Sequence, residues 1–509
     1  MASCCKIFNV ILLALGLIIG IMFFRAEVYF PNVPLSDRCN QTHEPIGGQA
    51  ILDRFTQALK IKTITRDRNL YDPEALIEFG KFLRKSFPTI YSSPIVQVET
   101  VNNYSLLYTV KGSDPTLKPY LLCSHMDVVS VELDKWTYPP FGGVISDDGF
   151  IYGRGTIDVK NTLMSIMESL EYLLNHGFKP KRSFYIAFGH DEEGLGIDGA
   201  QEIAKTFVKK GIKEFEFLLD EGMTILQNQF PGVSSNVAII GVSEKGFVSL
   251  NLKSKGEVGH SSMPPEDTVI TKLARAVSKI TGTSHKNLFG LGPEKVMLET
   301  FATKASYPFK LVYSNLWVFG PIVSRFFSQS PSGNGFVRTT SAVTIFNSGF
   351  KENVLPGSAE AVVNHRIHPI QTVEEVIEYD KYLIDDPSIE IEIKGNDFIK
   401  AHPISPYGSD SFGYNTIKKS IDQVFDNVLT TPGIFLATTD TRWYLKFTKS
   451  VYRFSPSVMM NKEDMKRFHG HNERISVDNY LKTVNFYHHI MMNSDKPKLD
   501  IDYTVKDEL

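Results

Sequence analysis

Apolar positions recur with two different periods between residues 45 and 241. In ILDRFTQALKI and TLMSIMESLEYLLNHGF they recur every three or four residues, which predicts amphipathic helices. PYLLCSHMDVV and RSFYIAFGHDEE instead contain short continuous apolar runs, which predict buried strands. Helices that alternate with buried strands favour an α/β domain with a mostly parallel sheet flanked by helices. Such sheets bind ligands beyond the carboxyl ends of their strands.

The pattern changes near Val242. Residues 242–395 follow the order strand, helix, two strands, helix, strand, beginning with KGFVSLNLKSKG and ending with SIEIEIKG. This order predicts a ferredoxin-like α+β sandwich. We interpret it as a lid domain inserted into the first domain. Residues 45–241 and 396–505 would then be the two parts of the first domain, the second part completing the original sheet.

An extra apolar and aromatic stretch, YPFKLVYSNLWVFGPIVSRFF, lies within residues 288–330 of the insert. Its simplest interpretation is a helical packing surface. The alternative is a wall for an acyl chain or a patch that touches a membrane, because large apolar surfaces usually have a partner.

The two ends of the chain suggest a compartment. Residues 1–30 contain an apolar run from Val10 to Phe24, which fits either a signal peptide or a signal anchor. Residues 506–509 read KDEL, an address for retention in the endoplasmic reticulum. Sequons at Asn40 and Asn103 are compatible with a glycoprotein. We therefore expect the lumen of the endoplasmic reticulum or, alternatively, secretion.

Composition narrows the class of protein. A chain of 509 residues exceeds the size of a single core, so at least two domains are expected. Apolar residues make up 42%, charged residues 22%, and the net charge is −3, so the basic excess that nucleic-acid binding requires is missing. We expect no nucleic-acid partner. Beyond the amino-terminal segment the cysteines are Cys39 and Cys123, too few for a disulfide scaffold.

Several chemically active side chains follow predicted strands. His125 and Asp127 are two residues apart, so they share one face of an extended strand. By itself this pair could be a core histidine satisfied by a carboxylate. Further acids follow in GRGTIDVKN, FGHDEEGLG and FLLDEG, and histidines in RFHGHNERI. Clustered carboxylates raise one another's pKa unless a cation compensates them. Histidine with carboxylates suits zinc or manganese, and this many ligands fits two metals better than one.

The motifs SHMDVV, GRGTIDVK, HDEEGLG, LLDEG, GHSSMPP and FHGHNE together carry a resemblance. In this order they resemble the di-zinc amidohydrolase family that includes aminoacylase-1, carboxypeptidase S and succinyl-diaminopimelate desuccinylase. The resemblance covers nearly all of the chain from about residue 50, and implies a zinc-peptidase-like catalytic domain with an inserted lid. Within the family, the chain is most similar to the members that make and hydrolyse N-fatty-acyl amino acids.

The resemblance implies two Zn²⁺ ions per chain. Their five ligands would be His125, Asp158, Glu193, Asp220 and His469. Asp158 would bridge the ions, with His125 and Asp220 on one and Glu193 and His469 on the other. His471 is an alternative to His469. The family often has a second acid and a cis peptide bond after the bridging aspartate, whereas this chain has Val159.

The resemblance also implies roles beside the metals. Asp127 would orient His125 by accepting its second ring proton. Glu192 would take a proton from water and return it to the departing amine. His260 would stabilise the oxyanion.

Two residues of the insert would hold the substrate. Arg366 would clamp its carboxylate, for which a bidentate guanidinium is suited. Asn353 would contact the oxyanion or the substrate amide, although a turn role is nearly as plausible for it.

We therefore expect an enzyme that hydrolyses, and in reverse forms, the amide bond of N-acyl amino acids, with long-chain fatty acyl groups favoured. One alternative is a carboxypeptidase that acts on dipeptides or short peptides. Another is a catalytically silent luminal protein that binds acylated ligands. The small-molecule partners of the expected enzyme would be N-acyl amino acids, fatty acids and amino acids. Membrane contact through the amino terminus or the lid is possible, and so is a homodimer, because some relatives complete the site across a dimer.

Overall fold

The computed structural model describes residues 2–32 and 45–497. The KDEL sequence, Cys39 and the sequon at Asn40 lie outside this part. Asn103 is exposed in the turn between two strands.

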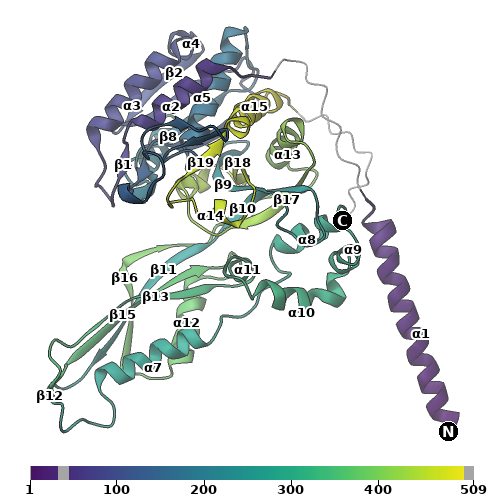
Figure 1. The fold of residues 1–509 in the computed structure, drawn as a ribbon, viewed down its shortest axis with the longest axis vertical. Coiled ribbons are helices and arrows are strands. Elements are labelled where there is room, and N and C mark those ends of the chain that lie inside the picture. Colours follow the sequence, from purple (N-terminus) through teal and green to yellow (C-terminus); the bar gives the residue numbers. More distant parts are fainter. Residues whose placement is uncertain (1, 33–44, 498–509) are drawn as a thin grey trace.

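An eight-stranded mixed sheet forms the body of the larger domain (Figure 1). Its strand order is β17-β10-β18-β9-β4-β8-β3-β2. The bounds are β2 Val96–Val101, β3 Ser105–Val110, β4 Tyr120–His125, β8 Phe184–Gly189, β9 Leu218–Leu226, β10 Asn236–Glu244, β17 Val428–Phe435 and β18 Val451–Met459. Strands β8, β4, β9 and β18 are parallel to one another, as predicted. Strand β3 pairs antiparallel with both β2 and β8, and β10 is antiparallel to β9 and β18.

Helices cover both faces of this sheet, which confirms the predicted α/β architecture. One face packs against the first group of helices, and the other against the short helix α6 and its neighbours. The bounds are α2 Gln49–Lys60, α3 Pro73–Ser86, α4 Pro88–Ser92, α5 Lys160–Asn175, α13 Phe412–Val424 and α15 Val477–Ser494 on the first face, and α6 Ala200–Lys209 on the second. The strands of the centre are therefore buried on both sides, which explains their continuous apolar sequences.

The insert contains a four-stranded antiparallel sheet of order β13-β15-β11-β16. Its elements are β11 Gly246–Lys255, α7 Val269–Gly282, β13 Thr340–Ser348, β15 Ser358–Ile367, α12 Val373–Ile384 and β16 Ile389–Ile399. Helices α7 and α12 pack on one face around Leu250, Leu273 and Val363. This arrangement is the predicted order of strands and helices. The chain changes sheets at Lys245, and β16 ends at Ile399, so both limits lie slightly after the predicted 242 and 395.

Four short helices lie between α7 and β13. They are α8 Glu294–Ala302, α9 Phe309–Tyr313, α10 Leu316–Phe327 and α11 Pro331–Val337. Met297, Phe301 and Leu316 are buried against Ile239 of β10 and Leu429 of β17. The extra apolar stretch is therefore a helical packing surface on its buried face, while Trp317, Ile322 and Phe326 of α10 remain exposed.

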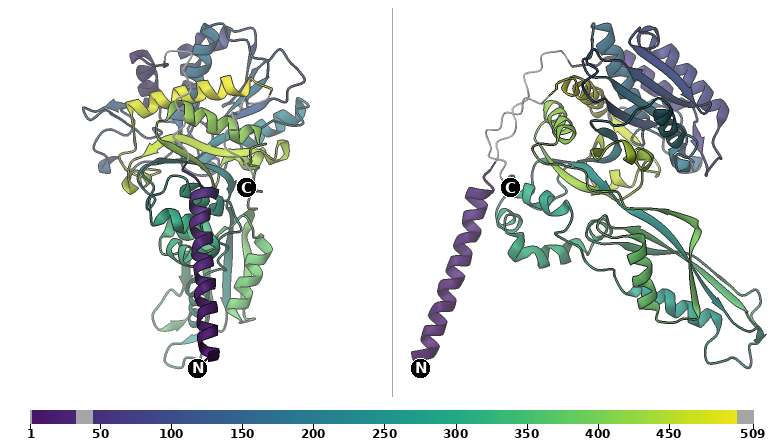
Figure 2. Two further views of the ribbon diagram at one scale, coloured as in Figure 1. Left: turned by 90° about the vertical axis from the view of Figure 1, so that its right-hand side faces the viewer. Right: turned by 180° about the vertical axis from the view of Figure 1, so that it is seen from behind.

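Helix α1, Ala2–Phe24, projects away from the rest of the molecule (Figure 2). Lys6–Tyr29 is long and apolar enough to cross a membrane, a property that signal sequences share. The end of this segment nevertheless packs against the insert: the Asn315 side-chain amide donates to the carbonyl of Met22 over 3.0 Å, and Arg25 Nε donates to the carbonyl of Ser314 over 3.0 Å.

Candidate active site

The predicted ligands converge where parallel strands end. His125 is the last residue of β4, and Glu192 and Glu193 lie in a short turn after β8. Asp158 precedes α5, and His469 lies in the loop after β18. Segments far apart in the sequence thus bring their side chains to the carboxyl edge of one sheet, where ligands bind in such folds.

Asp158 lies between two histidines. Its Oδ1 is 3.3 Å from Nε2 of His125, and its Oδ2 is 3.0 Å from Nε2 of His469. Nε2 of His469 is also 3.3 Å from Oε2 of Glu193. One carboxylate with an oxygen toward each histidine is what a bridging ligand requires. His471 instead faces Glu132, so the geometry favours His469 as the late ligand.

A second group forms around the same His125 ring. Nε2 of His125 is 3.4 Å from Oε1 of Glu221, and Glu192 completes this group. Glu221 was not among the predicted ligands, whereas its neighbour Asp220 was, and that prediction remains open. The Asp220 Oδ1 accepts a hydrogen bond from the backbone N–H of Glu221. Adjacent side chains on a strand point to opposite sides, so the two acids in LLDEG have different environments.

Asp127 holds three groups in place. Nδ1 of His125 lies 3.0 Å from the Asp127 carbonyl oxygen and 3.3 Å from its Oδ1. The two carboxylate oxygens accept the backbone N–H groups of Glu192, over 3.1 Å, and Glu193, over 3.2 Å. Asp127 therefore positions a metal ligand and the turn that carries the candidate base at the same time.

A buried ion pair connects the motif FHGHNE to the motif GRGTIDVK. Nη1 of Arg154 is 2.6 Å from Oε2 of Glu473, and Nη2 donates to the carbonyls of His469 and Gly470. Glu473 Oε1 also accepts the backbone N–H groups of Gly155, Ile157 and Asp158. Sequence analysis gave Arg154 and Glu473 no role, although both stand inside the quoted motifs.

The peptide bond between Asp158 and Val159 is cis, as the resemblance implies, even though no second acid follows.

The buried acids of the site have raised pKa values, which is the environment that a bound cation would compensate. Burial raises the pKa of Glu192 well above its usual range, and Glu221 raises it further. Burial likewise raises the pKa of Glu221 to about 8 and that of Asp220 to about 6. Within the described residues, Glu193 Oε1 and Asp220 Oδ2 are buried and make no hydrogen bond. These carboxylates and imidazoles suit divalent metals, which would supply the missing positive charge.

Three predicted residues lie apart from this group within one chain. His260 is in β12, Gly259–His260, which pairs with β14, Val354–Leu355. The backbone N–H of Ser261 donates to the carbonyl of Asn353 over 3.2 Å, so His260 and Asn353 are neighbours. Figure 1 places this pair of strands at the far tip of the lid.

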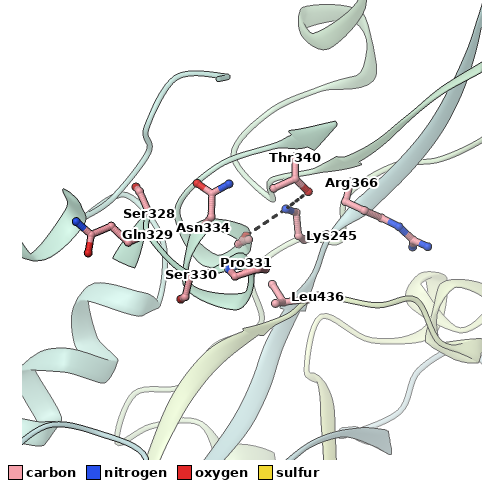
Figure 3. Close-up of a pocket in the computed structure, with 10 residues that line it drawn as sticks. Lys245, Ser328, Gln329, Ser330, Pro331, Asn334, Thr340, Arg366 and Leu436 are labelled. Carbon is pink, nitrogen blue, oxygen red and sulfur yellow. Dashed lines mark hydrogen bonds between the residues drawn. The ribbon is translucent and has the colours of Figure 1, made fainter. Parts of the chain in front are cut away.

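Arg366 lies at the other end of the lid, next to the larger domain. Its guanidinium carbon is 5.0 Å from the centre of the Phe247 ring. Arg366 and Lys245 line a cavity of about 550 Å³, but the guanidinium points away from the lysine (Figure 3). The Lys245 ammonium donates to the carbonyls of Gly335 and Arg338.

The fold and the buried group of ligands define a hydrolase of the metallopeptidase type. The chain belongs to peptidase family M20/M25/M40, whose family model matches residues 121–493.

Curated relatives extend the comparison. Over 445 residues, 87% of this chain and 86% of the relative, it is 44% identical to the N-fatty-acyl-amino acid synthase/hydrolase PM20D1 of Xenopus tropicalis. Over 496 residues, 96% and 95% of the two chains, it is 42% identical to the N-fatty-acyl-amino acid synthase/hydrolase PM20D1.1 of Danio rerio. Carboxypeptidase S of Saccharomyces cerevisiae is 30% identical over 501 residues, 89% and 85% of the two chains.

Solved structures show the same fold. The M20 family metallo-carboxypeptidase Sso-CP2 of Sulfolobus solfataricus has a TM-score of 0.64 at 16% identity, covering 88% of this chain and 100% of that one. The YXEP protein of Bacillus subtilis, a dinuclear metal binding peptidase, has a TM-score of 0.53 at 12% identity, covering 88% and 98%.

Proposed function

We propose that this protein hydrolyses the amide bond of N-acyl amino acids, with long fatty acyl chains preferred, and forms the same bond in the reverse direction. The observation that carries the proposal is Glu192, a buried carboxylate of raised pKa beside the ligand group. Two relatives above 40% identity that are named as N-fatty-acyl-amino acid synthase/hydrolases support the substrate class. Both directions follow because a catalyst accelerates a reaction and its reverse equally.

The metal ligands would be those that face one another in the structure. His125, Asp158, Glu193 and His469 form one continuous set, and Glu221 extends it. We propose two Zn²⁺ ions here. When bound, they would polarise the scissile carbonyl and lower the pKa of water.

Glu192 and Asp127 have separate roles in the reaction, proton transfer and positioning. Glu192 accepts a proton from the attacking water and delivers it to the amine nitrogen as the carbon–nitrogen bond breaks. Burial and the neighbouring Glu221 raise the pKa of Glu192, which favours a group that must give a proton back as well as take one. Asp127 keeps Glu192 in position through the backbone N–H.

The assay compares N-oleoyl-phenylalanine, N-acetyl-phenylalanine and a dipeptide, offered to the zinc-loaded protein. We expect the oleoyl compound to be hydrolysed fastest. Glu192→Gln should lower kcat by at least about a hundredfold, because it removes general acid–base catalysis. Glu132→Gln, an exposed acid outside the site, should leave the rate unchanged.

Each of the other results selects an alternative. Preference for the dipeptide would favour a carboxypeptidase, the activity for which the yeast relative is named. Zinc binding without turnover of any substrate would favour a silent binder of acylated ligands.

We further propose that the site is completed in a homodimer. Strand β12, which contains His260 and pairs with β14 next to Asn353, lies at the tip of the lid, far from β8 and β9 of the large sheet, as Figure 1 shows. His260 of the partner subunit would then stabilise the oxyanion, while Arg366 clamps the substrate carboxylate from the base of the lid.

We also propose that α1 is not cleaved and anchors the protein in the membrane, with the folded domains in the secretory lumen. Ala26 and Phe30 are buried against the rest of the protein, and Lys310 donates to the side chain of Asn32 over 3.0 Å. Cleavage after the apolar run would remove part of this packing. Full-length protein should remain in the membrane pellet after alkaline carbonate extraction, whereas release of a chain that begins beyond residue 30 would indicate a signal peptide.

A further inference from the structure

A second group of metal-ligating side chains lies in the lid, outside the site described above. Its members are His285, between α7 and α8, His365 on β15, and Asp380 on α12. All three are buried: His285 is 3% exposed, and the other two are 0% exposed. They come from three segments that the lid fold packs together, and none of them belongs to the motifs that carry the catalytic chemistry.

The candidate ligand atoms of the three residues all lie within 4.8 Å of one another. Nε2 of His365 is 2.8 Å from Oδ2 of Asp380, and Nε2 of His285 is 3.8 Å from Oδ1. The two imidazole rings are nearly perpendicular, with centroids 5.6 Å apart. Zinc bonds of about 2.0–2.2 Å in tetrahedral geometry place ligand atoms about 3.3–3.6 Å apart, which lies between the two observed distances.

Apart from Nδ1 of His365, the side-chain polar atoms of this group make no hydrogen bond within the described residues, although His365 and Asp380 form a close ion pair. Within the described residues, neither ring nitrogen of His285 and neither carboxylate oxygen of Asp380 makes a hydrogen bond. A buried polar atom left without a partner destabilises the folded state, and an unpaired carboxylate does so more strongly.

Two surrounding contacts hold the ligands in place. Nδ1 of His365 is 2.9 Å from Oγ of Ser341, which leaves Nε2 directed at Asp380. Metal-binding histidines usually make such a hydrogen bond with their other nitrogen. Nη1 of Arg338 donates to the carbonyl of His285 over 3.0 Å and so fixes the segment that carries this ring.

We propose that His285, His365 and Asp380 bind a third divalent metal ion, with zinc as the best match to two imidazoles and one carboxylate. Three protein ligands leave a fourth position for water. The ion would tie α12, β15 and the segment before α8 to one another. The ion would therefore stabilise the lid and take no part in the reaction. Its presence does not depend on whether the proposed substrate class is right.

The test counts metals in the full-length protein, purified and equilibrated with zinc, by inductively coupled plasma mass spectrometry. We expect three zinc ions per chain in the wild type and two in His285→Asn. The matched control is His368→Asn. His368 is also a buried lid histidine, but its ring contacts backbone groups of Phe336 and Ile370. It should retain three ions.

Thermal unfolding separates metal loss from misfolding. The variant His469→Asn is altered in the catalytic site but still holds the lid ion, so chelator should lower its Tm. In the double variant His469→Asn/His285→Asn, the part of this drop that is due to the lid ion should disappear. Ser341→Ala, which keeps all three ligands, should weaken binding of the third ion about tenfold. Two ions in the wild type, or three in both His285→Asn and Asp380→Asn, would overturn the proposal.

Discussion

At the scale of single residues, neighbouring acidic side chains in the site make different contacts and so have different roles. Asp127 accepts the backbone N–H groups of Glu192 and Glu193, so one carboxylate sets the positions of a candidate base and a candidate ligand. Glu221 reaches toward His125, while Asp220 accepts the backbone N–H of Glu221. Pairs of neighbouring acids therefore cannot be assigned from their spacing alone, because the backbone decides which one faces the metals.

This division predicts different effects for two neighbouring substitutions. Glu221→Gln should lower the affinity for one of the two catalytic-site metals by at least about tenfold, because it replaces a facing carboxylate with a neutral amide. Asp220→Asn should have a smaller effect. Metal titration followed by calorimetry measures both affinities. If Asp220→Asn loses a metal and Glu221→Gln keeps both, the ligand chosen from the sequence is the correct one.

At the scale of elements, the connection between the domains depends on one buried cation. Strand β10 ends at Glu244 in the large sheet, and β11 begins at Gly246 in the lid sheet. Lys245, between them, is 1% exposed, and its ammonium donates to the carbonyl of Arg338 over 2.9 Å. The connection is thus held by hydrogen bonds from a charge that the fold has removed from water.

Lys245 should make stability depend on pH. Burial, together with the nearby charge of Arg366, lowers its pKa to about 7, whereas the unfolded value is about 10.4. Between these values the unfolded state binds a proton that the folded state does not. The free energy of unfolding should therefore rise with pH, by at most about 1.4 kcal/mol per pH unit.

Urea unfolding at pH 7, 8 and 9 measures the free energy of unfolding of the wild type and of Lys245→Met, and so tests this pH dependence. The stability of the wild type relative to the variant should increase across the series, since other groups cancel in the difference. Lys81→Met, an exposed position on α3, should show a constant difference. A constant difference for Lys245→Met as well would mean that this lysine stays protonated in the folded state.

The sequence predicted the elements more completely than the site. The apolar runs and helical periods anticipated the central strands and the order of the lid, because burial on one or both faces determines those patterns. The edges of the large sheet were less predictable, since pairing direction depends on connections. The positions of His260 and Arg366 at opposite ends of the lid depend on how two domains pack, which local motifs do not encode.

At the scale of the whole molecule, the lid separates residues that the reaction is proposed to unite. The tip with β12, the strand of His260, is remote from β8 and β9 in Figure 1, and α8–α11 pack on the larger domain beside the base of the lid. Closure within one chain would have to disturb that apolar packing. A second copy, related by symmetry, could deliver the tip without doing so.

Complementation between two inactive variants tests this arrangement. His260→Ala and Glu192→Gln chains, mixed and allowed to exchange subunits, should recover up to about a quarter of wild-type activity, because half of the dimers are mixed and each mixed dimer has one intact site. Each variant alone should stay inactive. Failure to recover activity despite proven exchange would place His260 and Glu192 in one chain.

The bond between Arg154 and Glu473 joins residues that are 319 positions apart in the chain. During synthesis, the early ligands leave the ribosome long before His469 and Glu473 exist. A growing chain therefore carries an incomplete set of ligands for most of its synthesis, and the carboxyl-terminal segment supplies the last of them. The site can therefore form only after His469 and Glu473 have been synthesised and have folded back onto Arg154.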